Sequence, residues 1–521
     1  MTTVEPPAAP RATLRMAAGV VAAAVAVGVG HLVASFIDPV TSPLLAVGSA
    51  LIDAAPTPAK ELAVRTLGTN DKPVLLTTVA LVLLVFAAAL GLVAWRHPRI
   101  AYAGIALLGV AGIVAALLRG GLVDTVPSIA AGVAGVLAMR LLVSRGSGPP
   151  AAADEAPAAS AIDAAAGRSR RGFLLALGGT AAVAALAGGG GIVVGKVKAA
   201  SSAARRALGL PAPTSPAPPL PDGVQVSGVQ PYITANDDFY RVDISLVTPH
   251  VDASSWKLTI DGMVDNTLEL SYDDLLAMPL IERNITLTCV SNEVGGNYVS
   301  TTKWLGVPFS EIIKRAGVQP GVDQVYSYSS DSGYTCSTPF QAVNDGRDAM
   351  IVVGMNGEVL PDAHGYPARM LVPGLFGFVS ATKWLERIEF TTYAKRTAYW
   401  TERKWATDAP ILTQTKIEVP KSLGTLPKDK SVIAGVAWAQ HRGIEKVEIR
   451  IDGGEWKNVT LAADGGIDLW RQWSYPYDGP AGLHSAEVRA TDLDGKTQPE
   501  ERTKVFPDGA RGWHQIQFTS E

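Results

Sequence analysis

Hydrophobic and polar residues are distributed in two different ways along the chain, and the change falls near residue 200. Before it, apolar residues follow one another in runs of about 20, the length that a helix needs to cross the hydrocarbon core of a bilayer. After it, apolar and polar residues alternate over short distances, as in the elements of a soluble protein. We therefore predict an N-terminal α-helical transmembrane bundle over residues 1–200. Its five helices are expected at about 16–37, 73–95, 100–118, 122–143 and 172–195.

Basic residues lie at alternating ends of these five helices. Positively charged flanks stay in the cytoplasm, so we predict a cytoplasmic N-terminus and an extracytoplasmic location, outside a bacterial plasma membrane, for everything after residue 195. The apolar stretch from Pro43 to Ala55 is too short to span and is expected along the membrane surface. Lys196 and Lys198 go against the simple charge rule. The basic residues assigned to the cytoplasm are Arg11, Arg15, Arg96, His97, Arg99, Arg140, Arg145, Arg168, Arg170 and Arg171.

The segment from Ser169 to Leu174 gives a second reason for the last helix to point outward. It resembles a twin-arginine export signal placed just before a mild, Gly/Ala-rich apolar run. The alternative is an ordinary basic anchor at the start of a helix. The export interpretation predicts a folded, cofactor-loaded domain held by an uncleaved helix. Residues 146–167, rich in Ala and Pro, are expected to form a flexible cytoplasmic linker.

Three parts are predicted after the membrane region: a Pro-rich stalk over 201–221, an α+β domain over 222–408 and an all-β sandwich over 409–521. Ser271 is a candidate N-cap for a helix over 272–277, and Gly317 should end a helix over 310–316. Asn356-Gly357 marks a hairpin turn. In the last part the expected strands are 431–438, 446–451, 469–475 and 485–491.

Cys289 is the candidate for chemistry. It stands at the end of an alternating β-branched segment, 284–288, and faces a turn-forming loop that contains Gly295-Gly296. A thiolate in that position is a plausible soft metal ligand, and a buried inert thiol is the commoner alternative. The only other cysteine is Cys336, so an iron–sulfur cluster, a multi-cysteine zinc site and a disulfide-stapled scaffold are excluded. One Cys289–Cys336 disulfide stays open. The net charge of −3 does not suggest a nucleic-acid partner.

An ordered set of motifs after residue 236 resembles the sulfite oxidase family of molybdopterin-dependent oxidoreductases. The resemblance implies a sulfite-oxidase-type molybdopterin domain, an immunoglobulin-like C-terminal domain of the dimerising type, and a mononuclear molybdenum held by a single pterin. Cys289 then stands where the family's metal-binding thiolate belongs. The motifs are 239–241, 287–289, 291–292, 304–308, 354–358, 364–369, 372–374 and 383–385.

The same resemblance implies roles for further residues. Arg369 is the natural partner of the pterin phosphate, because a guanidinium forms charge-assisted hydrogen bonds with phosphate oxygens. Cys336 is expected to be a small packing residue. The implied catalytic residues are Cys289, Arg241, Trp405 and Tyr399; the implied cofactor-binding residues are Tyr240, Arg241, Asn292, Asp331, His364, Arg369, Ser380 and Lys383.

Two departures from the family pattern bear on the substrate. Sulfite oxidases have a substrate-binding arginine five residues after the metal cysteine, and this chain has Val294 there. Trp405 stands near the place of a family tyrosine, with Tyr399 close by. Because an anion such as sulfite needs fixed cations, a sulfoxide or N-oxide is the better expectation. Arg442 and Arg471 are candidates to reach the mouth of the site from the C-terminal domain.

The sequence thus predicts a membrane-anchored molybdenum–molybdopterin enzyme that transfers an oxygen atom to or from a small molecule or a protein sulfoxide. The alternatives are a sulfite oxidase or dehydrogenase, and a non-enzymatic surface module with a Cys289–Cys336 disulfide. No haem or iron–sulfur motif is found in the sequence. Electrons are therefore expected from a separate protein or a quinone, and a homodimer is possible.

Overall fold

The computed structural model describes residues 11–56, 59, 66, 71–118, 121–146, 159–206, 209–331, 333–428 and 431–521. The chain forms two compact units. One comprises residues 1–201 with 245–248, and the other comprises 202–244 with 249–521. We describe each unit by itself.

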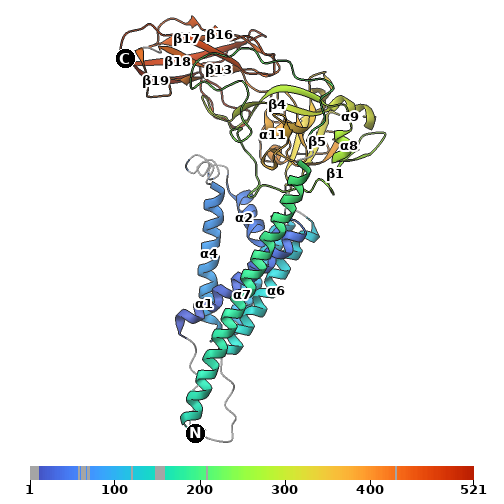
Figure 1. Ribbon diagram of the computed structural model, residues 1–521, viewed down its shortest axis with the longest axis vertical. Helices are drawn as coiled ribbons and strands as arrows, with labels where there is room; N and C mark the ends of the chain where they lie inside the picture. The colour runs from blue at the N-terminus through green and yellow to red at the C-terminus, as the bar shows by residue number, and fades with distance from the viewer. Residues whose placement is uncertain are drawn as a thin grey trace. The chain divides into compact units, whose positions relative to one another are not determined.

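The first unit is helical, and five of its described helices are long and apolar enough to cross a membrane. All five lie where the hydrophobic pattern predicts them (Figure 1). The apolar helix of 12 residues, α2, is too short for this, as expected. The bounds are α1 Ala12–Phe36, η1 Pro39–Thr41, α2 Pro43–Ala54, α4 Asp71–Ala94, α5 Pro98–Leu117, η3 Leu122–Thr125, α6 Val126–Gly146 and α7 Ala159–Arg206.

Small residues let α1 and α4 approach closely in opposite directions. A Cβ atom on Gly19 would lie 2.0 Å from the carbonyl oxygen of Ala87, and one on Gly91 would lie 2.3 Å from that of Arg15. The start of α1 therefore packs against the end of α4. Contacts of this kind are favoured between apolar helices because small residues allow the backbones to meet.

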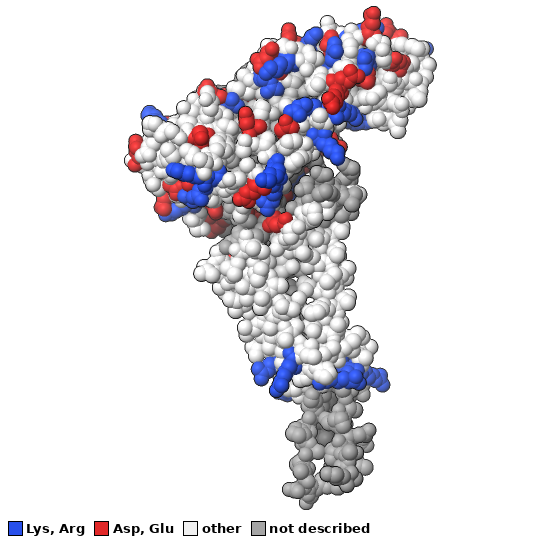
Figure 2. Space-filling model, turned by 180° about the vertical axis from the view of Figure 1, so that it is seen from behind, with Lys and Arg blue, Asp and Glu red and all other residues white. Residues whose placement is uncertain are grey.

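The basic flanks of the helices come together at one end of this unit. Trp95, after α4, packs edge-to-face on Phe173 of α7 at 5.9 Å between ring centroids. Phe173 also clusters with Ala18 of α1 and Leu142 of α6. Figure 2 shows Lys and Arg gathered at one end of an otherwise nearly uncharged helical surface. This arrangement agrees with a shared side for the basic residues and leaves the identity of that side a prediction.

Helix α7 is longer than the fifth predicted helix, with 48 residues from Ala159 to Arg206. Residues 159–167 are therefore helical, so the prediction of a flexible linker is wrong for that part. Residues 147–158 of the linker lie outside the described residues. The export-signal segment lies within α7. The side chains of Ser169 and Arg170 are not among those described, and the signal remains a prediction.

The second unit begins with an extended segment that does not stand free. The backbone N–H of Thr214 donates to the carbonyl of Leu280 at 2.8 Å, and that of Glu282 donates to Ser215 at 2.8 Å. Residues 214–215 thus run along the edge of β3 (Ile281–Thr288). This part of the predicted stalk therefore packs on the domain, and its first residues, 201–206, belong to helix α7.

The α+β domain contains two sheets. One has the order β2-β1-β10-β5-β6, and the other has the order β3-β4-β7-β8, with β9 paired to β7. The bounds are β1 Lys257–Gly262, β2 Leu268–Ser271, α8 Tyr272–Leu276, β4 Val299–Pro308, α9 Phe309–Ala316, β5 Gln324–Ser329, β6 Thr335–Pro339, α10 Phe340–Asn344, β7 Met350–Met355, β8 Glu358–Val359, η4 Asp362–His364, β9 Arg369–Leu371, α11 Gly377–Ser380, β10 Leu385–Thr391 and α12 Tyr399–Glu402.

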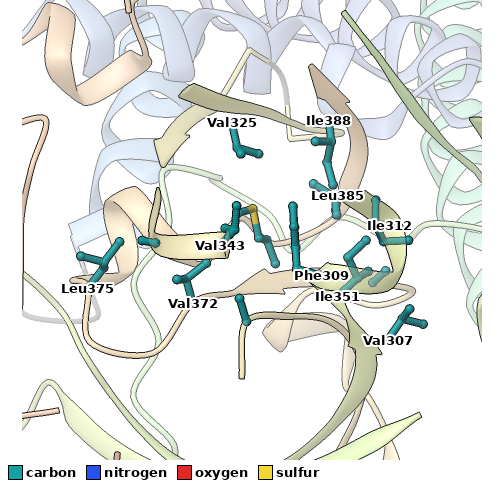
Figure 3. Packing of buried hydrophobic residues seen from close by; sticks show 14 of the residues in the cluster. Val307, Phe309, Ile312, Val325, Val343, Ile351, Val372, Leu375, Leu385 and Ile388 are labelled. Atoms are coloured by element: carbon teal, nitrogen blue, oxygen red, sulfur yellow. The ribbon is translucent and has the colours of Figure 1, made fainter. Parts of the chain in front are cut away.

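Local sequence rules account for several of these boundaries. Ser271 caps α8, because its hydroxyl accepts from the N–H of Asp274 at 3.1 Å. Gly317 ends α9 in the left-handed region at φ +64°. Asn356 and Gly357, at φ 53° and 79°, turn β7 back to β8. Between the sheets lies a large apolar core, part of which is drawn in Figure 3 with Phe309 and Ile351 near its centre.

The C-terminal region is made of strands in two further sheets, ordered β11-β13-β17-β16 and β12-β19-β18-β14-β15. Trp473 of the first and Phe518 of the second are fully buried in one shared cluster. The four predicted strands are present. That the C-terminal region is of the immunoglobulin type remains a prediction. The bounds are β11 Gln414–Val419, β12 Gly424–Leu426, β13 Val432–Trp438, β14 Ile444–Ile451, β15 Lys457–Asn458, β16 Thr460–Leu461, β17 Arg471–Pro476, β18 Gly482–Asp492 and β19 His514–Ser520.

Candidate functional site

Cys289 is the first residue after β3 and opens a hydrogen-bonded loop. Its N–H donates to the carbonyl of Tyr298 at 2.9 Å, and its own carbonyl accepts from the N–H of Asn292 at 3.0 Å. The side-chain oxygen of Asn292 accepts from the N–H of Tyr298 at 2.8 Å. The loop over 289–298, which we call the cysteine loop, is therefore closed at its base and holds the sulfur in one place.

The thiol of Cys289 is buried and free, as is that of Cys336. The disulfide that one alternative required is therefore absent. Burial raises the pKa of Cys289, while Ser291 and the charge of Lys383 act to lower it. The Sγ atom lies 2.9 Å from the hydroxyl oxygen of Ser291. A soft cation at this position would displace the proton, because metal coordination deprotonates a thiol.

The C-terminal region holds the cysteine loop from outside. The ammonium of Lys416 on β11 donates to the carbonyl of Gly296 at 3.3 Å. It also pairs with Glu418 at 3.1 Å, with side chains that are 3% and 4% exposed. The ring of His514 on β19 fills the space beside Gly295, where a Cβ atom would lie 2.3 Å from it. The sequence analysis did not find Lys416, Glu418 or His514, because nothing in the local pattern links residues so far apart.

A second set of contacts reaches the strand itself. The side-chain N–H of Gln440 donates to the hydroxyl of Thr288 at 2.9 Å, directly before Cys289. The backbone N–H of Trp470 donates to the hydroxyl of Thr286 at 2.8 Å. The cysteine is thus positioned jointly by its own domain and by the C-terminal region.

Arg369 on β9 is a buried cation with unused donor capacity. Its two terminal nitrogens donate to the carbonyls of His364 at 3.2 Å and Ala381 at 3.3 Å. Its Nε has no hydrogen-bond partner among the described residues. Burial lowers the pKa of Arg369 to about 10. The guanidinium also lies over the ring of Trp304 at 5.1 Å.

Lys383 and Arg241 meet at one carboxylate that the sequence analysis missed, Asp243. The ammonium of Lys383 lies 2.7 Å from Asp243 Oδ2, and Arg241 Nε lies 2.9 Å from the same oxygen. Burial lowers the pKa of Lys383 to about 8. The Lys383 side chain is 12% exposed and that of Arg241 is 40% exposed. A single carboxylate thus orients two predicted cofactor-binding cations.

Tyr240 and His364 add neutral polar groups to this region. Burial raises the pKa of Tyr240 well above its usual value, with a further contribution from Cys289 that places the two groups near each other. Burial lowers the pKa of His364 to about 4, so the imidazole is neutral at pH 7. Its Nε2 lies 2.9 Å from the carbonyl oxygen of Asn236 and must therefore donate to it. Phe239 packs edge-to-face on the His364 ring at 5.5 Å.

The other predicted cofactor-binding residues, Asp331, Asn292 and Ser380, differ in whether their side chains are already hydrogen-bonded. Asp331 is buried just after β5, and its carbonyl accepts from the N–H of Tyr334 at 3.0 Å. The side-chain nitrogen of Asn292 has no hydrogen-bond partner among the described residues. Ser380, in contrast, uses its hydroxyl locally, because it donates to the carbonyls of Leu375 and Phe376, each at 3.0 Å. Its role toward a phosphate remains a prediction.

The two aromatic residues proposed for catalysis belong to one aromatic cluster. Tyr399, in α12, lies 5.8 Å from Tyr334 between ring centroids, and the guanidinium of Arg403 covers its ring at 3.5 Å. Burial raises the pKa of Tyr334 well above its usual value, and Cys336 and Cys289 both add to this. Trp405 reaches the cluster through Trp400 at 5.9 Å. Trp405 itself packs on Phe378 and Phe506.

The two arginines of the C-terminal region that were expected at the mouth of the site form ion pairs and hydrogen bonds elsewhere. Arg442 pairs with Asp492 at 3.0 Å and donates to the carbonyl of Ile411 at 2.8 Å. Arg471 donates to the carbonyl of Ile444 at 2.9 Å. The structure therefore does not place either guanidinium at Cys289.

These residues fit a pterin-held metal better than a metal held by protein alone. Among the described residues, no group of three or more His, Cys, Asp and Glu side chains could bind an ion. One thiol would then need a cofactor to supply further ligands. The unpaired Nε of Arg369 and N–H of Asn292 are buried donors that an anionic cofactor would satisfy.

Comparison with known proteins agrees with this chemistry. Residues 245–400 match the family described as "Oxidoreductase molybdopterin binding domain". Mitochondrial sulfite oxidase of Homo sapiens is 27% identical over 341 residues, with 55% of this chain and 61% of that protein covered. The NADH nitrate reductase of Solanum lycopersicum is 29% identical over 318 residues, with coverage of 48% and 34%. The chain therefore spans less than two thirds of these curated relatives.

A solved structure is also similar: the sulfane dehydrogenase SoxCD from Paracoccus pantotrophus. Its TM-score is 0.48 at 22% identity, with 56% of this chain and 82% of that chain covered. The molybdopterin domain and the sulfite oxidase relatives agree with the motifs around Cys289 and Arg369. Residues 245–400 are therefore a molybdopterin-binding oxidoreductase domain, and the chain is similar to the sulfite oxidases over that part.

Proposed function

We propose that this protein is a membrane-anchored molybdenum enzyme that transfers an oxygen atom to or from a small uncharged substrate outside the cytoplasm. The observation that carries the proposal is the buried thiol of Cys289, which lies at the end of β3 and feels the charge of Lys383. Molybdenum bound to a pterin dithiolene supplies two-electron redox chemistry and accepts or donates an oxygen atom.

Different residues of this chain would bind the metal and the phosphate of that cofactor. Cys289 provides the protein ligand of the metal, and the cysteine loop fixes its direction. Arg369 and Lys383 are buried cations that suit the phosphate of the pterin, because charge-assisted hydrogen bonds to phosphate are strong. Arg241 is more exposed and lies at the same carboxylate as Lys383. Asp243 holds the side chains of Lys383 and Arg241 in position, so that both can also bind the pterin phosphate.

The proposed substrate class rests on Val294. This half-buried valine stands in the cysteine loop at the place where sulfite oxidases have an arginine. Without that cation, an anionic substrate loses a fixed partner, whereas a sulfoxide or N-oxide loses little. We therefore favour reduction of a small sulfoxide, an N-oxide or a methionine sulfoxide in a protein. Tyr399 and Trp405 would shape the apolar side of the substrate site.

Sulfite oxidation is the second candidate, and one observation favours it. Sulfite oxidases lead the curated relatives, with the human enzyme aligned over 341 residues. A panel of dimethyl sulfoxide, trimethylamine N-oxide, methionine sulfoxide and sulfite, assayed with artificial electron donors and acceptors, separates the two. We expect turnover with a sulfoxide or N-oxide. Sulfite-dependent reduction of the acceptor, with no reduction of the other three, would establish the second candidate. Molybdenum below one atom per chain in active preparations would overturn both.

The membrane part of the proposal concerns position and partners. Five apolar helices support anchoring in a bilayer. Cytoplasmic basic flanks would put the second unit outside, where a separate electron-transfer protein or a quinone serves it. The C-terminal sandwich is proposed to be immunoglobulin-like and to mediate a homodimer. A phosphatase fusion after residue 521 tests the side, because alkaline phosphatase is active only outside the cytoplasm. Activity from a fusion at residue 146 instead would reverse the topology.

A further inference from the structure

The arginines at one end of the helical unit form a charged surface that the proposed function does not use. Ala18, Leu142 and Phe173 make a small buried cluster there, and Leu14 and Trp95 pack against it. Figure 2 shows Lys and Arg gathered at this end, with no Asp or Glu beside them in that view. The arginines that flank the cluster, which we call the basic belt, are Arg11, Arg15, Arg96, Arg99, Arg140, Arg145 and Arg171.

The chain places the belt directly around this cluster. Arg15 follows Leu14, and Arg96 follows Trp95, so two residues that pack on the cluster are each next to an arginine. Arg171 precedes Phe173 by two residues on α7. Cations that are far apart in the sequence are therefore brought together by the packing of four helical segments.

The basic belt has no acidic partner in the part of the chain that the structure describes. None of its seven arginines forms an ion pair with a described residue. Asp38, which follows α1, and Asp124, which precedes α6, lie at the other end of the unit. The described residues thus leave the positive charge of the belt unneutralised. The helix ends that carry the belt contain no Asp or Glu over residues 11–20, 88–104, 136–146 and 171–182.

The cations of the belt are open to a ligand. Only the Nε atom of Arg15 is enclosed; its two terminal nitrogens are accessible, and neither has a hydrogen-bond partner among the described residues. The other six arginines are exposed. A half-buried stem with an accessible head is typical of an arginine that reaches toward the surface of a membrane.

An apolar surface adjoins these cations and selects the kind of anion. Leu174 and Leu175, on α7 next to Phe173, are 45% and 70% exposed. Trp95 is half-buried, and tryptophan is enriched at the level of lipid headgroups. A free phosphate would use the guanidinium groups alone, through charge-assisted hydrogen bonds. A phospholipid would use both surfaces, because its acyl chains also cover the leucines.

We propose that the basic belt binds an anionic phospholipid. Arg15 and Arg96 bind the phosphate of the headgroup beside Trp95, and the acyl chains lie along the exposed leucines of α7. Groups of about four to eight basic residues at the end of a membrane helix attract acidic headgroups in this way. The inference rests on the membrane anchoring in the proposed function. It holds whichever side of the membrane this end faces, and it does not depend on the reaction at Cys289.

The test uses the full chain, loaded with its cofactor and purified in a nonionic detergent. Phosphatidylglycerol and phosphatidylcholine with identical acyl chains are titrated separately, and native mass spectrometry gives the affinity of the first bound lipid. We expect phosphatidylglycerol to bind at least about fivefold more tightly. Arg15→Gln should weaken its binding about fivefold, because one cation beside an anionic headgroup is worth about 1 kcal/mol. Arg15→Gln combined with Arg96→Gln should weaken it further, with unchanged affinity for phosphatidylcholine.

Lys72→Gln is the matched control, because Lys72 lies at the opposite end of α4. It should bind phosphatidylglycerol as the parent does. Equal affinity of the parent for the two lipids would overturn the proposal, as would unchanged phosphatidylglycerol binding in the double variant. Complete displacement of bound phosphatidylglycerol by millimolar inorganic phosphate would show a site for a small anion only. A chain that stays dispersed in buffer without detergent would contradict the membrane anchoring instead.

Discussion

The two cysteines of this chain share burial but differ in their surroundings. Cys289 ends a strand, opens a polar loop and lies near the charge of Lys383. Cys336 lies inside β6, where its thiol donates to the carbonyl of Phe378 at 3.2 Å. Burial raises the pKa of both thiols. Burial alone therefore does not distinguish the proposed metal ligand from Cys336; the charge of Lys383 and the hydrogen-bonded cysteine loop do.

The largest expected effect separates the two thiols directly. Cys289→Ser should abolish turnover, by more than about 10³-fold, because a serine hydroxyl is a poor soft ligand. Cys336→Ser is the matched control and should keep most of the activity. The measurement is turnover per folded protein in the substrate panel. Equal losses of turnover in the two variants would contradict the assignment of Cys289, rather than Cys336, as the metal ligand.

The next effect concerns the contact of Lys416 with the cysteine loop, which has no counterpart described here for Cys336. Lys416→Met leaves Glu418 buried and unpaired, which should cost about 3–5 kcal/mol in the free energy of unfolding. Lys416→Met combined with Glu418→Gln should recover much of this loss. Urea unfolding measures both variants. Amide exchange in the cysteine loop should rise in the single variant, while exchange in β6 around Cys336 should stay constant.

Acid should lower the free energy of unfolding, because two buried histidines, His364 and His514, become protonated. Burial lowers the pKa of His364 and of His514 to about 4 from 6.5. The unfolded chain therefore binds more protons between these values, and stability is lost as pH falls from about 6.5 to 4. His364 contributes at most about 3 kcal/mol of that loss. His514→Gln should flatten the profile of unfolding free energy against pH. An unchanged slope would contradict this account.

The smallest effect is a difference in reactivity. In protein without cofactor, iodoacetamide should modify Cys289 several-fold faster than Cys336, because Lys383 favours the thiolate and the cysteine loop can open. Mass spectrometry of timed samples gives the two rates. Lys383→Met should narrow the ratio, whereas Lys457→Met, on β15, should leave it unchanged. A faster Cys336 would show that the strand opens more readily than the loop.

Much of the architecture followed from local patterns. Apolar runs close to 20 residues long predicted the five apolar helices, because a bilayer imposes that length. Ser271 and Gly317 marked helix ends through their own chemistry. Strands β11 and β19 were not predicted, although Ile516 and Phe518 of β19 alternate with Gln515 and Gln517. Residues 159–167 were assigned to a linker although they are helical. The site residues from Tyr240 to Lys383 came from ordered motifs, not from periodicity.

By itself, the sequence determined the apolar helices, the position of Cys289 at a strand end and the set of residues that resembles a molybdopterin site. Only the tertiary structure decided that Asp243 joins Arg241 to Lys383, that Lys416 and His514 hold the cysteine loop, and that Gln440 of the C-terminal region donates to Thr288. The reason is physical. Helix length and capping depend on neighbouring residues, whereas a buried ion pair or a shared amide depends on which distant strands are brought together, and no local pattern records that choice.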